Sequence, residues 1–92
     1  MADLDKEKQK LVSRIKRIRG QVDSIERSLT TGDDCADVLM LLANVRGGIN
    51  SLMAEVMEDH IRNHVANPDT DPDADRARGA AELIEVVRTY LK

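Results

Sequence analysis

Large aromatic side chains are almost absent from this sequence, which has no Trp, no Phe and a single Tyr, Tyr90. Aromatic residues usually supply the largest units of buried area, so aliphatic side chains must form the core. A chain of 92 residues is one domain at most and buries only a modest share of its surface when it folds alone. We therefore expect one domain over residues 1–92 that gains further burial by associating with other chains.

Cysteine and long apolar runs are also scarce. The one cysteine, Cys35, cannot form a disulfide within the chain. No N-terminal apolar segment resembles a secretion signal, and no run approaches the roughly 18 to 20 apolar residues of a membrane-spanning helix. The sequence therefore predicts a protein of the reducing cytoplasm without a membrane partner.

Basic charge is concentrated at one end of the chain, although the net charge is -3. Residues 1–19 carry seven basic and three acidic side chains, whereas the remainder carries seven basic and fourteen acidic ones. The N-terminal basic residues are Lys6, Lys8, Lys10, Arg14, Lys16, Arg17 and Arg19. They suit contacts with DNA phosphates, and a merely solvated basic face is the alternative. No helix-turn-helix, zinc-finger or basic-zipper pattern accompanies them.

Apolar residues recur at intervals of three and four, which predicts an all-α fold with three helices. The first apolar stripe stops at Thr30-Thr31-Gly32, a typical helix end, and the second meets no proline before Pro68. The predicted elements are helix one (about 4–30), helix two (about 34–65), an acidic, proline-containing linker (66–74) and helix three (about 75–92).

Helix two is too long for a compact monomer of this size. About 30 residues at 1.5 Å each give roughly 45 Å, whereas the radius of gyration of such a monomer is about 12 Å. The apolar stripe of helix two therefore predicts pairing with a copy of itself. Gly47-Gly48, near the middle of the helix, permits close backbone approach there.

One cysteine and two histidines on helix two form the candidate sensing site. His60 and His64 lie one turn apart, a spacing that suits two imidazoles sharing a metal ion. Cys35 shares the face of His60 but lies about 37 Å from it along the helix axis. When two copies pack antiparallel about Gly47-Gly48, Cys35 of one chain comes beside both histidines of the other. The sequence thus predicts two intersubunit sites per dimer, suited to nickel, cobalt, copper or zinc.

Plainer interpretations of these residues exist. The histidines can be solvated cations near a helix end, and Cys35 can be a small buried apolar residue. A cysteine nucleophile beside His60 would suggest catalysis, but no oxyanion-hole motif or third orienting residue accompanies it, so no enzyme is predicted. A structural or metal-buffering helical oligomer that never touches DNA is a further alternative.

Four features carry a family resemblance that covers nearly the whole chain. They are the run RIKRIRGQV from Arg14 to Val22, the block VRGGINSLMAEV from Val45 to Val56, the Cys35/His60/His64 set and the closing VRTYLK. Together they resemble the CsoR/RcnR/FrmR transcriptional repressors. The resemblance implies dimers of antiparallel helices, built as four-helix bundles, that pair into flat tetramers and bind promoter DNA until an inducer releases it.

The resemblance also implies roles for individual residues. It places Cys35, His60 and His64 at sensing positions. It places Arg14, Arg17 and Arg46 at DNA-contact positions, to which the basic face of helix one adds Lys10, Lys16 and Arg19 as candidates.

The inducer is open between a metal and formaldehyde. Copper sensors of the family have a second cysteine where this chain has His64, so the set resembles the nickel/cobalt branch, with zinc as a further candidate. Those sensors carry a histidine where this chain has Asp3, which offers at best a carboxylate oxygen. Formaldehyde sensors join an N-terminal amine to the cysteine through a methylene bridge, and Ala2 would offer such an amine to Cys35 once Met1 is removed. We expect a metal-responsive repressor, with a formaldehyde-responsive one as the alternative.

Overall fold

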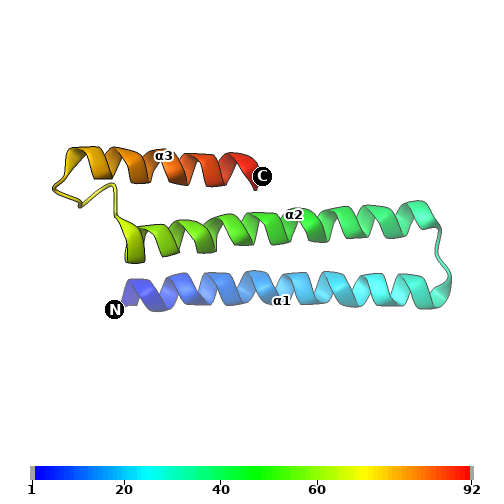
Figure 1. Cartoon of the computed structure of the whole chain (residues 1–92). Coiled ribbons are helices and arrows are strands. Elements are labelled where there is room, and N and C mark those ends of the chain that lie inside the picture. The colour runs from blue at the N-terminus through cyan, green and yellow to red at the C-terminus, as the bar shows by residue number, and fades with distance from the viewer. Residues whose placement is uncertain (1, 92) are drawn as a thin grey trace. The chain divides into compact units, whose positions relative to one another are not determined.

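The computed structural model describes residues 2–91, with side chains from Lys6 to Leu91, and consists of helices joined by short connections (Figure 1). No strand occurs among these residues, so the predicted all-α fold with three helices is confirmed. None of the helices described combines the length and the apolar character needed to span a bilayer. The elements are α1 (Ala2–Thr31), α2 (Cys35–His60), the π-helical turn η1 (Ile61–Val65) and α3 (Ala74–Tyr90).

The chain forms two compact units, Met1–Ile49 and Asn50–Lys92, and their boundary falls inside α2. The first unit holds α1 and the first half of α2, whereas the second holds the rest of α2, η1 and α3. Each unit has its own cluster of buried apolar side chains.

In the first unit, α1 and the first half of α2 run antiparallel as a helical hairpin (Figure 1). Ile25 of α1 packs with Val38 and Val45 of α2, and Ile18 and Leu41 flank this cluster. Four of these five residues lie at the regular three-and-four intervals that predicted the helices. The apolar stripes therefore do meet within the chain, but over a small area.

The turn between α1 and α2 uses a glycine-ended helix terminus. Gly32 has a φ of 78°, in the left-handed region that side chains with a Cβ rarely adopt. The Asp33 N–H donates to the Ser28 carbonyl at 3.0 Å, which is the six-to-one bond of a Schellman motif. The Asp33 carboxylate also accepts a 2.7 Å hydrogen bond from the Ser28 hydroxyl. These bonds end α1 at the Thr-Thr-Gly signal.

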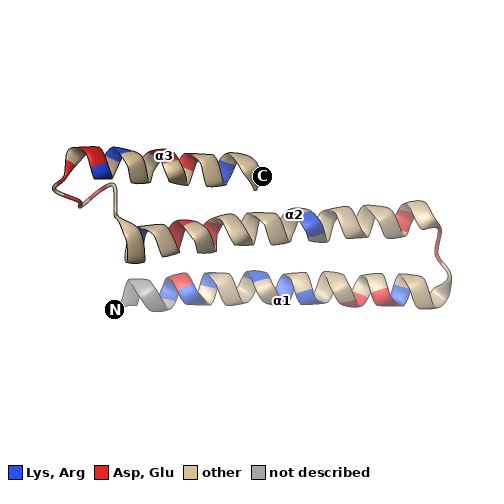
Figure 2. Cartoon of the chain, viewed as in Figure 1, with Lys and Arg blue, Asp and Glu red and all other residues tan. Residues whose placement is uncertain are grey.

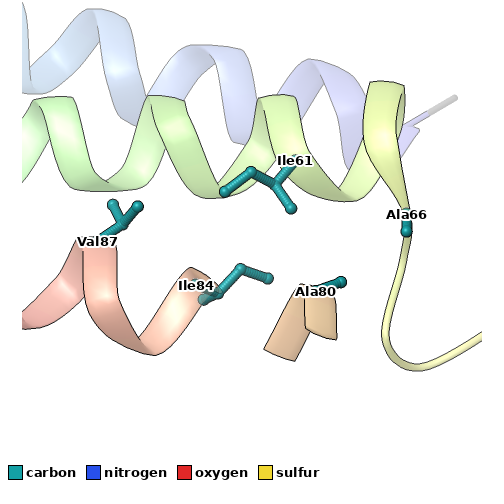
Figure 3. Close-up of a cluster of buried hydrophobic side chains, with 5 residues drawn as sticks. All are labelled: Ile61, Ala66, Ala80, Ile84 and Val87. Carbon is teal, nitrogen blue, oxygen red and sulfur yellow. The ribbon is translucent and has the colours of Figure 1, made fainter. Parts of the chain in front are cut away.

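In the second unit, α3 packs on the end of α2 and on η1 through a cluster of aliphatic side chains (Figure 3). Ile84 and Val87 project from α3 toward the segment that carries Ile61, and Ile84 is only 3% exposed. The remaining members of the cluster are Ala66 and Ala80.

The predicted linker is an ordered capping segment. Asp73 is the N-cap of α3, and its carboxylate accepts hydrogen bonds from the backbone N–H groups of Asp75 and Arg76 at 3.0 and 3.2 Å. The Arg76 guanidinium donates to both oxygens of Asp71, at 2.6 and 2.9 Å. These hydrogen bonds lower the pKa of the Asp71 carboxyl below its usual value. The acidic residues of the linker therefore fix the start of α3.

The last turn of helix two differs from the sequence prediction. An α-helix is expected to about residue 65, but α2 ends at His60 and η1 follows. The Ala66 N–H donates to the Ile61 carbonyl at 2.9 Å, the i to i+5 bond of a π-helix. In an α-helix, residues five apart lie about 140° apart around the axis. The wider turn instead lets both Ile61 and Ala66 join the cluster against α3.

Candidate sensing site and nucleic-acid surface

The two histidines predicted for the sensing site lie together at the junction of α2 and η1. The ring centroids of His60 and His64 are 5.0 Å apart, and their planes are inclined by 40°. Both residues are exposed, so a ligand from outside the unit can reach the rings. An exposed pair of imidazoles at this distance can supply two nitrogen ligands to one ion.

The third residue predicted for the sensing site is Cys35. It is the first residue of α2, it is exposed, and it carries a free thiol. It belongs to the first compact unit, whereas both histidines belong to the second. Within the described part of one chain, no three Cys, His, Asp or Glu side chains form a group that could hold a metal ion.

Two further candidate sensing residues, Ala2 and Asp3, fall where the side chains lie outside the described part of the structure. The backbone of both belongs to α1.

A network of ion pairs surrounds the π-helical turn that carries His64. The Arg62 guanidinium donates to Glu58 at 3.1 Å and to Asp69 of the linker at 2.8 Å. Glu58 in turn accepts from the Arg88 guanidinium of α3 at 2.9 and 2.6 Å. The hydrogen bond to Glu58, and then that to Asp69, raises the pKa of Arg62 above its ordinary value.

This network was not predicted from the sequence. The only signal in the sequence is the i, i+4 spacing of Glu58 and Arg62, which predicts a helical ion pair. The second partner of each residue comes from the linker or from α3, so its identity depends on the tertiary fold.

The candidate DNA-contact residues lie in the first compact unit. Figure 2 shows that Lys and Arg predominate over the first part of α1. Arg14 is half-buried, whereas the other candidates are exposed, namely Lys10, Lys16, Arg17 and Arg19 of α1 and Arg46 of α2. Exposed guanidinium and ammonium groups concentrated on one helix suit the repeated negative charge of a nucleic-acid backbone.

The chain is thus all-α, with a basic first helix and a Cys/His set carried by α2 and η1. Comparison with known proteins identifies the family. The chain belongs to the metal-sensitive transcriptional repressors, because the sequence model of that family matches residues 7–89. The family consists of transcriptional regulators and not enzymes, which confirms the prediction that this protein is not an enzyme.

Similar proteins support the same family. The chain is 40% identical over 92 residues to an uncharacterised protein from the bioA 5′ region of Serratia marcescens, and the match spans 100% of both chains. It is 39% identical over 61 residues to a homologue of the transcriptional repressor RcnR from Escherichia coli O139:H28 (strain E24377A / ETEC), covering 66% of this chain and 68% of that one.

A solved structure of the family has the same fold. It is a glutamate-to-histidine variant of the formaldehyde-responsive regulator FrmR from Salmonella enterica serovar Typhimurium. It matches with a TM-score of 0.65 and 40% identity over 92% of this chain and 94% of that chain. The predicted membership of the CsoR/RcnR/FrmR family is therefore confirmed. Members of this family sense metals or formaldehyde.

Proposed function

We propose that this protein represses transcription by binding double-stranded operator DNA and that nickel or cobalt, or zinc, releases it. The observation that carries the proposal is the exposed pair of His60 and His64, whose ring centroids lie 5.0 Å apart. Two imidazoles with the Cys35 thiolate form a ligand set that suits these ions and is poorly suited to magnesium or calcium. We place this activity in the cytoplasm, where a lone cysteine stays reduced.

The complete site, in our proposal, forms between two chains. Cys35 begins α2 and His60 ends it, so an antiparallel pair of α2 helices brings Cys35 of one subunit to His60 and His64 of the other. A two-fold axis then generates two equivalent sites per dimer. Gly47 supports this arrangement because, apart from its two neighbours and the backbone of its own helix, no described atom lies within 4 Å of where its Cβ would stand.

Exposed apolar side chains also support association. Leu42, Ile49 and Val56 belong to the predicted stripe of α2 and are 46%, 41% and 48% exposed. Among the described residues, more large apolar side chains are exposed than buried. Extended apolar surface of this kind marks interaction sites in proteins that function in water. We propose a homodimer built as a four-helix bundle, and pairing of two dimers into a flat homotetramer, as the family resemblance implies.

The basic part of α1 is proposed to contact the operator backbone through Arg14 and Arg17, with Arg46 of α2 and the neighbouring Lys10, Lys16 and Arg19. Phosphate contacts of this type make binding strongly salt-dependent. A metal releases DNA only when it binds the DNA-free form more tightly than the DNA-bound form.

Formaldehyde is the second candidate inducer, favoured by the 40% identity to a formaldehyde-responsive regulator and by the exposed free thiol of Cys35. In this reaction the N-terminal amine of Ala2 adds to formaldehyde and loses water. The Cys35 thiolate then attacks the resulting carbon. The product is a methylene bridge between nitrogen and sulfur, with one water released and no oxidant consumed.

One titration distinguishes the two inducers. The duplex upstream of the coding sequence is labelled with a fluorophore, and its anisotropy with the full-length protein is followed against nickel, cobalt and zinc chlorides and against formaldehyde. We expect the divalent metals to release the DNA from wild type but not from His64→Ala. Release by formaldehyde alone, unaffected by His64→Ala and accompanied by a mass gain of one carbon atom per cross-link, would instead establish the second candidate.

Two more variants test the sensing and DNA-binding assignments. Cys35→Ala should keep its operator affinity and lose the response to either inducer. Arg14→Glu with Arg17→Glu should abolish operator binding, whereas Arg27→Glu with Arg78→Glu changes the net charge equally and should retain it. Equal loss in both double variants would show that binding depends on overall charge and not on this surface. A protein that buffers metal without binding DNA would show no operator binding even as wild type.

A further inference from the structure

The π-helical turn η1 carries two residues that face different surroundings. His64 contacts the ring of His60 on an exposed surface, whereas Arg62 reaches Glu58 and Asp69. Arg62 and His64 therefore lie in the same five-residue turn although their side chains meet different partners. A side chain that holds the backbone of η1 in place therefore also sets the position from which the His64 side chain extends.

The bonds made by Arg62 span the whole turn. Glu58 lies one turn before η1 in α2, and Asp69 lies in the linker after it. The side chains of Arg62 and Glu58 are 27% and 20% exposed, so this pair is partly shielded from water, whereas that of Asp69 is 76% exposed. Arg62 thus ties the segment before the π turn to the segment after it, and Arg88 holds Glu58 from α3.

The backbone of the turn depends on the same arrangement. The i to i+5 bond from Ala66 to Ile61 is a geometry that chains rarely adopt, that occurs mostly as single turns and that is frequent at functional sites. A return to α-helical bonding would shift the linker relative to Arg62, and so would change the geometry of its 2.8 Å bridge to Asp69. Burial of Ile61 and Ala66 stabilises the turn on one side, and the Arg62 bridges stabilise it on the other.

We propose that Arg62 is a positioning residue for the sensing site, because its bridges to Glu58 and Asp69 hold the π-helical turn that sets His64 against His60. Its role in induction rests on the function proposed above, whereas its effect on the histidine pair does not. The partly shielded bridge to Glu58 contributes more than the exposed bridge to Asp69, since solvent weakens exposed ion pairs.

The test uses four single variants of the full-length chain. Arg62→Met removes both bridges and keeps much of the aliphatic stem. Arg62→Lys keeps the charge but lacks the planar fork that reaches two carboxylates. Asp69→Asn weakens only the exposed bridge. Arg78→Met is the matched control, because Arg78 also binds a carboxylate, that of Asp75 at 2.7 Å, but does so on the surface of α3.

Two readouts are measured for each variant. The chain has two histidines in all, so the nuclear Overhauser effect between their ring protons can be assigned without ambiguity in the metal-free protein. Cobalt chloride affinity is measured separately by the visible absorption of the bound ion. We expect Arg62→Met to lose the ring-to-ring effect and to bind cobalt about tenfold more weakly, the lower end for residues that orient metal ligands. Arg62→Lys and Asp69→Asn should fall between it and wild type, and Arg78→Met should match wild type.

A folded Arg62→Met protein that keeps both the ring-to-ring effect and wild-type cobalt affinity would overturn the proposal. If this variant does not fold, as judged by its circular dichroism, Arg62→Lys and Asp69→Asn decide the question. Unchanged readouts in both would refute the proposal. A wild-type protein that binds no cobalt refutes the metal response alone, because the ring-to-ring effect still reports whether Arg62 positions His64.

Discussion

Gly47→Ala is expected to weaken self-association although it should stabilise α2 within a single chain. Gly47 lies in the interior of α2, and apart from its two neighbours and the backbone of that helix no described atom stands within 4 Å of the position of its missing Cβ. A glycine in a helix interior costs about 1 kcal/mol relative to alanine. Gly47→Ala should therefore raise the stability of the isolated chain by up to about 1 kcal/mol. Packing among the described residues of one chain does not require glycine at this position.

The proposed dimer supplies an explanation, because its two-fold axis passes close to Gly47 and brings the two helices together there. Two added methyl groups then enter one contact. Over-packing of this kind typically costs about 1 to 3 kcal/mol. The dissociation constant of the dimer should rise by a factor between about five and more than a hundred. Gly48 differs in this respect, because its Cβ would stand 3.6 Å from Ile18 of α1, an ordinary contact within the chain.

Analytical ultracentrifugation over a range of protein concentrations measures this effect directly. Gly79→Ala is the matched control, because Gly79 lies inside α3 and the position of its missing Cβ is equally open beyond its two neighbours and its own helix backbone. The control should melt at a higher temperature and sediment as wild type does. If Gly47→Ala behaves in the same way, the two α2 helices do not meet at Gly47 and the intersubunit site loses its geometric basis.

Two further predictions concern stability. Ile84→Ala should lower the free energy of unfolding, measured in urea, by about 2 to 4 kcal/mol, because Ile84 is 3% exposed. The control Leu83→Ala should lower it by less than about 1 kcal/mol, because Leu83 is 45% exposed. Equal losses would show that the cluster around Ile84 is not the core of this unit. The lowered pKa of Asp71 stabilises the fold above the ordinary carboxyl pKa near 3.9, and this contribution disappears as the pH falls from there through the folded value. The free energy of unfolding of Asp71→Asn should therefore be lower than that of wild type near pH 7, and this difference should vanish in strong acid. A difference that stays the same at every pH would exclude the ion pair with Arg76 as its cause.

The fold could be predicted from the sequence wherever a local pattern determines the structure. Apolar stripes spaced by three and four residues predicted the helices, and Ile18, Ile25, Val38 and Val45 are members of these stripes that pack between α1 and α2 in the first unit. The Thr-Thr-Gly signal predicted the end of α1, because only a residue like Gly32 readily takes the positive φ required there. Both patterns depend on a few neighbouring residues.

The π-helical turn was not predicted because no local pattern requires it. Its stability depends on Ile61 and Ala66 meeting α3, and on Arg62 meeting Asp69, and all of these contacts follow from the tertiary fold. The spacing of His60 and His64 predicted that they lie together, and the structure shows their rings adjacent in this turn. The pairing of Cys35 with them remains a prediction, because it involves a second chain.

A sensing site divided between two chains would couple induction to subunit arrangement. Cys35 stands beside the turn that ends α1, and α1 also carries most of the candidate DNA-contact residues. A ligand that joins Cys35 of one subunit to His60 and His64 of the other therefore restrains the helix hairpin of the first relative to the π-helical turn of the second. Only the part of the binding free energy that differs between the DNA-bound and DNA-free arrangements drives release. In such a mechanism the rigidity of the turn around Arg62 matters as much as the identity of the ligands. A histidine pair that moved freely would bind the ion equally well in the DNA-bound and DNA-free arrangements, and the ion would then not release the DNA.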